Sequence, residues 1–161
     1  MTKNILVAVD DSPVAERALD YAAALAARLP EARITLFHVG KPARASMLEL
    51  DVLPEMHRTR EKLARYWAPE ATAQPAADDV LLERLRQRAL GLGMAPEAVE
   101  LRRAESVLNV PAAIAAEAEH GGYDTICLGR EDRASVGELF LGNIAERLLH
   151  QTPTATLWLV A

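Results

Sequence analysis

The chain has 161 residues, enough for one domain that buries a full hydrophobic core without metal or disulfide support. A net charge of −5 argues against nucleic acid as a partner, because domains that bind its phosphates normally carry a basic patch. The single cysteine, Cys127, excludes an internal disulfide, and its apolar surroundings are typical of a buried, unreactive thiol.

Half of the residues are hydrophobic but only 4% are aromatic, so the core must be built from Ala, Leu, Val and Ile. This composition favours close packing of helices on a sheet. The apolar run near the N-terminus is too short for a signal peptide, and no stretch reaches the length of a membrane helix. We therefore expect a cytoplasmic protein without a membrane partner.

The first predicted elements are a strand, a helix and a second strand. Residues 5–9 form a continuous apolar run, which is typical of a strand buried on both faces. Ser12 and Pro13 then supply a helix cap and a proline at the first helical position, and Pro30 stands where the helix should end. Residues 33–39 predict the second strand. The inward-facing helix residues are expected to be Val14, Ala18, Ala22, Leu25 and Leu29.

The middle of the chain is the least regular part. We interpret residues 43–78, with a predicted helix at 55–67, as an excursion from a single domain spanning residues 1–161, because the segment is too short for its own core. Residues 78–92 predict another helix, whose three arginines, Arg84, Arg86 and Arg88, are interpreted as a solvated face. Its inward-facing residues are expected to be Val80, Leu81, Leu85 and Leu92.

The remainder of the chain continues the alternation of strands and helices. The pattern predicts an edge strand at 99–104, a helix at 111–120 capped by Asn109 and ended by Gly121 and Gly122, a strand at 125–128, a helix at 143–150 and a strand at 154–160. This order indicates an α/β fold in which a parallel sheet is covered by helices on both faces.

Ligands of such sheets bind beyond the carboxyl ends of the strands, where the winding reverses. Asp10 and Gly129 both end predicted strands, so one site could contain both. Gly129 also opens a polar loop that leads to Gly142 and Asn143 at the start of a helix. A strand, loop and helix start in this order bind anions, because backbone N–H groups and the helix dipole face the loop.

The chain resembles the universal stress protein family at residues 5–12 (Ile-Leu-Val-Ala-Val-Asp-Asp-Ser), 36–39 (Leu-Phe-His-Val), 110–111 (Val-Pro) and 129–160. The resemblance covers nearly the whole length and is weakest at 43–78. It implies a three-layer α/β/α fold of the adenine nucleotide alpha hydrolase-like class, with a five-stranded parallel sheet in the order 3-2-1-4-5. It also implies a homodimer, and ATP or AMP bound at a loop of pattern Gly, two residues, Gly, nine residues, Gly, then Ser or Thr.

That loop pattern falls on Gly129, Asp132, Gly142 and Asn143, so the first and third glycines match and the other two positions do not. The resemblance implies that Asp10 lies near the adenosine and Val39 near the adenine. The residues expected to bind the nucleotide are Asp10, Val39, Gly129, Arg130, Gly142 and Asn143. Asp132 would repel phosphate, and Asn143 with Glu146 also fits a helix-capping pair.

Two functions remain open at this point. One is a universal-stress-type homodimer with a weakened adenine nucleotide site, and the other is a scaffold of the same type that binds no nucleotide and acts through protein contacts. We expect no enzyme activity, because no nucleophile and base are paired by a motif, and no metal, because the four histidines lack ligand spacing. The apolar last strand predicts pairing with the same strand of a second subunit.

Overall fold

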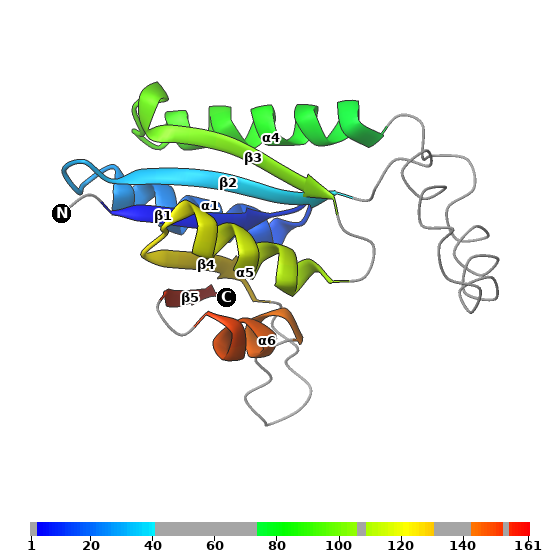
Figure 1. Ribbon diagram of the computed structural model, residues 1–161. Coiled ribbons are helices and arrows are strands. Elements are labelled where there is room, and N and C mark those ends of the chain that lie inside the picture. Colours follow the sequence, from blue (N-terminus) through cyan, green and yellow to red (C-terminus); the bar gives the residue numbers. More distant parts are fainter. Residues whose placement is uncertain (1–2, 41–73, 106–108, 131–142, 153–154) are drawn as a thin grey trace, which may run out of the picture.

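Five parallel strands form one sheet in the order β3-β2-β1-β4-β5, which confirms the predicted fold (Figure 1). The computed structural model describes residues 3–40, 74–105, 109–130, 143–152 and 155–161. The strands are β1 (Asn4–Val9), β2 (Arg33–Gly40), β3 (Val99–Glu105), β4 (Thr125–Gly129) and β5 (Thr156–Val160). The helices are α1 (Pro13–Ala26), α4 (Gln74–Gly91), α5 (Val110–Gly121) and α6 (Asn143–Gln151), with a 3₁₀ turn at Pro96–Ala98.

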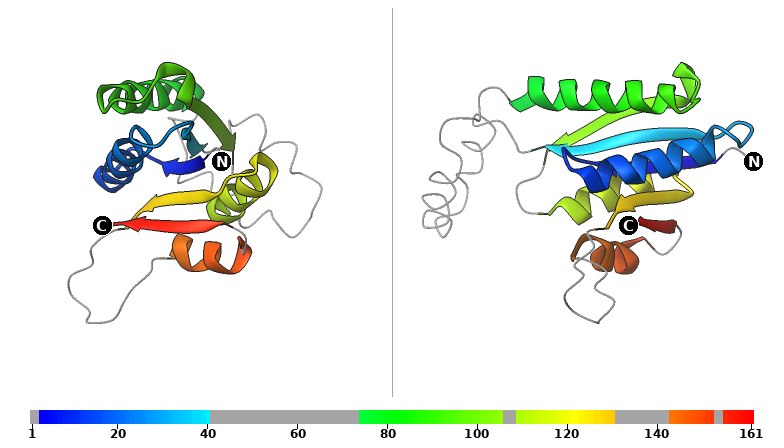
Figure 2. Two further views of the ribbon diagram at one scale, coloured as in Figure 1. Left: turned by 90° about the vertical axis from the view of Figure 1, so that its left-hand side faces the viewer. Right: turned by 180° about the vertical axis from the view of Figure 1, so that it is seen from behind.

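The helices make a layer on each face of the sheet (Figure 2). Helices α1 and α4 cover one face, where their alanines and leucines form a core with Ile5, Val7 and Leu36 of the strands. Helices α5 and α6 cover the other face and pack against Leu6 and Phe37, among others. Successive strand residues thus enter opposite cores, which explains why β1 and β2 are almost continuously apolar.

Local signals fix the starts of two helices as predicted. The Ser12 hydroxyl oxygen accepts a hydrogen bond from the Ala15 N–H at 3.2 Å, and Pro13 occupies the first position of α1. Asn109 caps α5 in the same way, accepting from the Ala112 N–H at 3.1 Å. Helix α5 ends at Gly121, and the following Gly122 caps it with a left-handed φ of 63° that suits glycine.

The predicted inner faces of the helices are partly wrong. Helix α1 ends at Ala26, so Leu29 lies beyond it and is exposed. Its buried stripe is Ala15, Ala18, Leu19, Ala22, Ala23 and Ala26. In α4 the described apolar residues that are buried are Leu82, Leu85 and Ala89, whereas Val80 is 70% exposed. Leu92 follows the helix and is 39% exposed. The apolar residues of α4 are spread around its circumference, so the packing, and not the pattern, selects the inner face.

Two predictions fall wholly or partly outside the described residues. The excursion at 43–78 is described only from residue 74, where α4 begins, and its predicted helix at 55–67 lies outside the described residues. The last strand was expected from residue 154, and β5 is described from Thr156. It lies at one edge of the sheet, and β3 lies at the other.

The inner face of α4 predicts opposite results for two substitutions in the same helix. Leu85→Ala should lower the free energy of unfolding by about 2–5 kcal/mol, because Leu85 is fully buried. Val80→Ala should change it by less than about 0.5 kcal/mol, because Val80 is exposed. Urea denaturation of both variants measures the difference, and equal losses would contradict this placement of α4.

Candidate functional site

The winding of the chain reverses between β1 and β4. From β1 the chain passes through β2 to β3 on one side, and β4 leads to β5 on the other. The two strands are direct neighbours, with Leu6 beside Ile126 and Val7 beside Cys127, so their carboxyl ends lie side by side. This is the position at which parallel α/β sheets bind ligands.

Four of the predicted site residues meet at this carboxyl edge. Asp10 follows β1 directly and is exposed, and Val39 lies near the end of β2, half-buried against the core under α5 and α6. Gly129 ends β4, and Arg130 follows it with its backbone N–H donating to the Val160 carbonyl at 2.7 Å. Three adjacent strands therefore contribute to one edge.

The remaining predicted residues belong to the segment between β4 and α6 or to the start of α6. Asp132 and Gly142 are outside the described residues. Asn143 is the first residue of α6, and its side chain is not described. Strand β4 ends at Gly129 and α6 starts at Asn143, the position that the sequence predicted for the helix start.

Asp10 is joined to the start of α1 by a short chain of hydrogen bonds. The Ser12 hydroxyl donates to Asp10 Oδ1 at 2.5 Å while its oxygen accepts from the Ala15 N–H. Ser12 therefore acts as a helix cap, as predicted. Its hydroxyl also orients the Asp10 carboxylate, which remains exposed at the edge.

Gly129 has a structural reason to be glycine. A Cβ atom at this position would lie 2.4 Å from the Val14 carbonyl oxygen and 3.0 Å from the Ala15 nitrogen. The missing side chain lets the first turn of α1 approach the end of β4, and this contact brings Asp10 and Gly129 to the same place. The glycine would be needed for this packing whether or not a phosphate binds beside it.

His38 and Asp78 are two residues of this edge that the sequence did not reveal. The His38 ring contacts the Val9 carbonyl oxygen through Nδ1 at 2.8 Å and Asp78 Oδ1 through Nε2 at 3.3 Å. Asp78, near the start of α4, is only 8% exposed. The sequence carried no signal for this contact, because it joins two elements separated by the excursion.

The two acidic residues after β1 have different partners. Asp11 pairs with Arg84 of α4 at 2.7 Å, whereas Asp10 accepts from Ser12. Arg84 also pairs with Glu16 of α1 at 2.5 Å.

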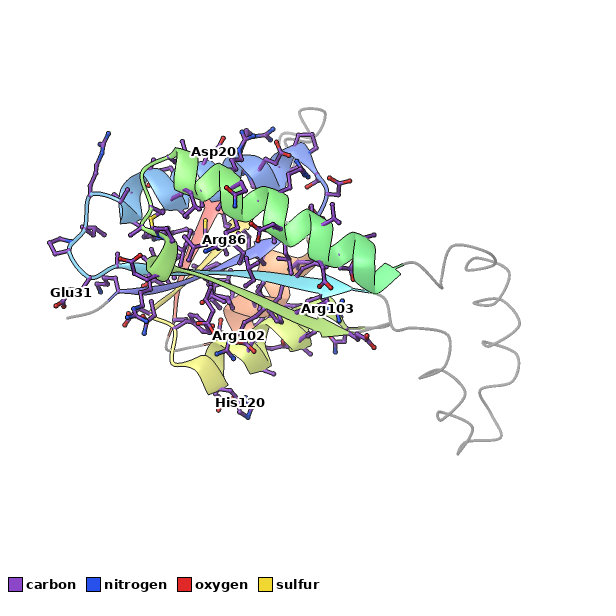
Figure 3. All side chains as sticks on the ribbon, turned by 90° about the horizontal axis from the view of Figure 1, so that it is seen from above. Asp20, Glu31, Arg86, Arg102, Arg103 and His120 are labelled. Atoms are coloured by element: carbon purple, nitrogen blue, oxygen red, sulfur yellow. The ribbon has the colours of Figure 1, made fainter. Side chains whose placement is uncertain are left out.

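A second arginine of α4 continues these contacts along α1. Arg88 pairs with Asp20 at 2.6 Å and with Glu16 at 3.3 Å. The hydrogen bond and charge of Asp20 raise the pKa of the Arg88 guanidinium. Figure 3 shows Asp20 on one side of α4 and Arg103 of β3 on the other. The interpretation of Arg84 and Arg88 as a solvated face was therefore wrong in part: they are exposed, but they tie α4 to α1.

Two further kinds of chemical group in the described part of the chain are the cysteine thiol and the side chains that can bind metal ions. Burial raises the pKa of the Cys127 thiol to about 12, so this group is protonated near neutral pH. Within the described ranges, no three His, Cys, Asp or Glu side chains are grouped so that they could hold a metal ion. None of the described helices is long and apolar enough to cross a membrane.

A cavity of about 410 Å³ opens at the opposite, amino edge of the sheet. Its walls include Asn4, Arg33, Thr35, Val99, Arg102 and Tyr123. None of the four predicted nucleotide residues that the structure describes with their side chains, Asp10, Val39, Gly129 and Arg130, lines it. The cavity and the predicted site are therefore separate features at opposite ends of the strands.

The comparisons with known proteins agree with this architecture. A sequence profile described as the universal stress protein family matches residues 1–159, and the chain therefore belongs to that family. No curated protein matched the chain.

Solved universal stress proteins share the fold over nearly their whole length. The UspA protein from Lactobacillus plantarum is 20% identical, with a TM-score of 0.67 over 99% of this chain and 97% of the other. A universal stress protein solved in complex with cAMP is 18% identical, with a TM-score of 0.66 over the same shares. The Archaeoglobus fulgidus protein in complex with dAMP is 16% identical, with a TM-score of 0.61 over 100% and 98%.

The contact between β4 and α1 predicts a large difference between two glycine substitutions. Gly129→Ala should destabilise the protein by about 1–3 kcal/mol, because its Cβ would overlap the backbone of Val14. Gly91→Ala is the control, since a Cβ there would meet no atom of the rest of the described structure, beyond its chain neighbours and its own helix backbone, within 4 Å. The stability of this variant should be unchanged or slightly raised. Thermal unfolding compares the two, and equal melting temperatures would show that the approach of α1 is looser than described.

Proposed function

We propose that this chain is a homodimeric, cytoplasmic regulatory or protective protein of the universal stress family, with a weakened adenine nucleotide site and no catalytic activity. The observation that carries the proposal is the meeting of Asp10, Val39, Gly129 and Arg130 at the carboxyl edge where the winding reverses. The solved relatives with cAMP and dAMP support an adenine nucleotide as the ligand class.

The roles follow from the chemistry of each group. The exposed Asp10 carboxylate can accept hydrogen bonds from ribose hydroxyls, and the half-buried Val39 offers an apolar surface to the adenine. Gly129 and the start of α6 present backbone N–H groups towards the phosphates. Gly142 and Asn143 complete the proposed phosphate contacts, and Arg130 supplies a positive charge beside them.

Asp132 is the reason to expect weak binding. A carboxylate about 6 Å from one phosphate charge costs roughly 3 kcal/mol at an effective dielectric near 20, which corresponds to about a hundredfold in affinity. Arg130 and Arg133 flank Asp132 in the sequence and offset part of this repulsion. Asn143 replaces the hydroxyl residue of the family pattern, and capping of α6 would compete for its side chain.

A second candidate function, a scaffold without nucleotide, is favoured by the contact at Gly129. Since the packing of α1 alone requires this glycine, its presence does not by itself indicate a phosphate site. With Asp132 and Asn143 also departing from the pattern, the loop would then be a remnant. Such a protein would act through its surfaces, and above all through the edge strand β5.

The two edges of the sheet favour a closed dimer through β5. Strand β3 carries Glu100, Arg102, Arg103 and Glu105, and charges of this kind oppose pairing with another strand. Strand β5 has no charged residue, and its residues from Leu157 to Val160 are all half-buried. Within β5, the Trp158 ring contacts the exposed Tyr21 ring of α1 edge to face, with 5.8 Å between the ring centroids. Pairing of two β5 strands across a two-fold axis would cover this apolar edge and close the assembly.

Titration calorimetry with ATP and AMP tests the nucleotide site. The wild type should bind weakly, and Asp132→Gly with Asn143→Ser should tighten ATP binding, by up to about a hundredfold if the repulsion is removed in full. Glu119→Gln is the charge control, because Glu119 is exposed near the end of α5, and it should leave the affinity unchanged. Absence of heat at millimolar ligand for wild type and double variant alike would remove the first function and leave the second.

The backbone of β5 offers a sharp test of the dimer. The backbone groups of successive residues in a strand point to opposite sides. The Thr156 N–H and the Val160 carbonyl bond to β4, so the N–H of Leu159, which lies an odd number of positions from both, faces the open edge. Leu159→Pro should therefore produce monomers of 17.5 kDa without breaking the β4 ladder, whereas Leu159→Ala, which keeps the N–H, should remain dimeric. Sedimentation velocity distinguishes them. A wild type that sediments as a clean monomer would refute the dimer.

A further inference from the structure

The His38 ring joins the ends of β1 and β2 to the first turns of α4. Its Nδ1 lies 2.8 Å from the Val9 carbonyl oxygen, and a carbonyl can only accept, so this nitrogen carries the donated hydrogen. Its Nε2 lies 3.3 Å from Asp78 Oδ1. The two side chains are 12% and 11% exposed, so solvent screens the contact little.

The end of β2 is shaped around the Asp78 carboxylate. A Cβ at Gly40 would lie 2.3 Å from Asp78 Oδ2, so any larger residue there would force this carboxylate to move from the strand end. One carboxylate oxygen thus contacts the His38 ring and the other lies over Gly40. Asp78 therefore holds the ring from the side opposite Val9.

The positions of the contacts relate them to the nucleotide site. Val9 directly precedes Asp10, and His38 directly precedes Val39, while Val9 and His38 are register partners. The ring lies on the face of α1 and α4, and Val39 packs towards the other core. From the face of α1 and α4, His38 therefore fixes the strand ends just before Asp10 and Val39, the two residues at which the adenosine is expected.

We propose that His38 and Asp78 are positioning residues for the adenosine end of the site: His38 fixes the turn from Val9 to Asp10, and Asp78 fixes the His38 ring. This inference rests on the proposed nucleotide-binding function. It adds a link between the site and α4, because the buried carboxylate belongs to the helix that follows the excursion. Movement at the start of α4 would be transmitted to Asp10 through one ring.

Two substitutions of His38 separate its contacts. In His38→Asn the amide nitrogen replaces Nδ1, so the bond to the Val9 carbonyl is kept and the Asp78 contact is lost. In His38→Gln the amide nitrogen takes the place of Nε2, so the Asp78 contact is kept and the Val9 bond is lost. Both remove the ring, and both should lower the melting temperature by similar amounts.

The affinity for AMP, measured by calorimetry, should separate these variants. His38→Gln should bind AMP about tenfold more weakly than wild type, because one hydrogen bond that orients Asp10 is lost, while His38→Asn should stay within about twofold. Hydrogen exchange without nucleotide should show faster exchange at the amides of Asp10 and Asp11 in His38→Gln only. Should His38→Gln fail to fold, Asp78→Asn keeps the ring but loosens its hold, so that Nδ1 can turn away from the Val9 carbonyl and AMP should bind several-fold more weakly. His38→Asn does not depend on this hold, because its shorter amide has no ring to turn.

The failures of the two proposals can be distinguished. A wild type that binds no AMP overturns the nucleotide function, and this inference with it, before any variant is made. A wild type that binds AMP, with His38→Gln and His38→Asn of equal affinity and equal exchange, overturns the positioning role alone. In that case His38 and Asp78 would only stabilise the fold.

Discussion

The pairing of β1 with β4 is the contact on which the site depends. It joins two halves of the chain that wind away from each other, β1 through β2 to β3 and β4 to β5. The first turn of α1 can lie against the end of β4 because Gly129 has no side chain there. Asp10 and Gly129, 119 positions apart in the sequence, are neighbours in space for this reason. The same pairing buries Ile126 and Cys127 in the centre of the sheet.

Much of the fold could be predicted because its signals are local. The apolar run before Asp10 marks β1, Ser12 with Pro13 starts α1, and Asn109 starts α5. The sheet order came from the family resemblance, since strand order depends on contacts between distant segments. The inner face of α4 was predicted only in part for the same reason: Leu85 is buried as expected. Val80 and Leu82 are equally apolar in the sequence, and only the neighbouring layer selects Leu82.

The candidate site also has a part that the sequence could predict and a part that it could not. Residues at strand ends could be predicted, because topology alone brings the ends of parallel strands to one edge. The partners of those residues could not. Arg84 contacts Asp11 across 73 positions, and His38 reaches Asp78 across the whole excursion. The charged partners at this edge, Arg84 and the buried Asp78, both belong to α4. No local pattern in the sequence encodes the position of α4 relative to β2.

The central claim is that an adenylate binds at the carboxyl edge between β1 and β4. Titration of isotope-labelled protein with AMP, followed by two-dimensional NMR of the backbone amides, tests it most directly. The account predicts that the amide signals of Asp10, Val39, Gly129 and Arg130 shift together along one binding curve. Shifts confined to the opposite edge, around Arg33 and Tyr123, or no shifts at any of the four residues, would contradict it.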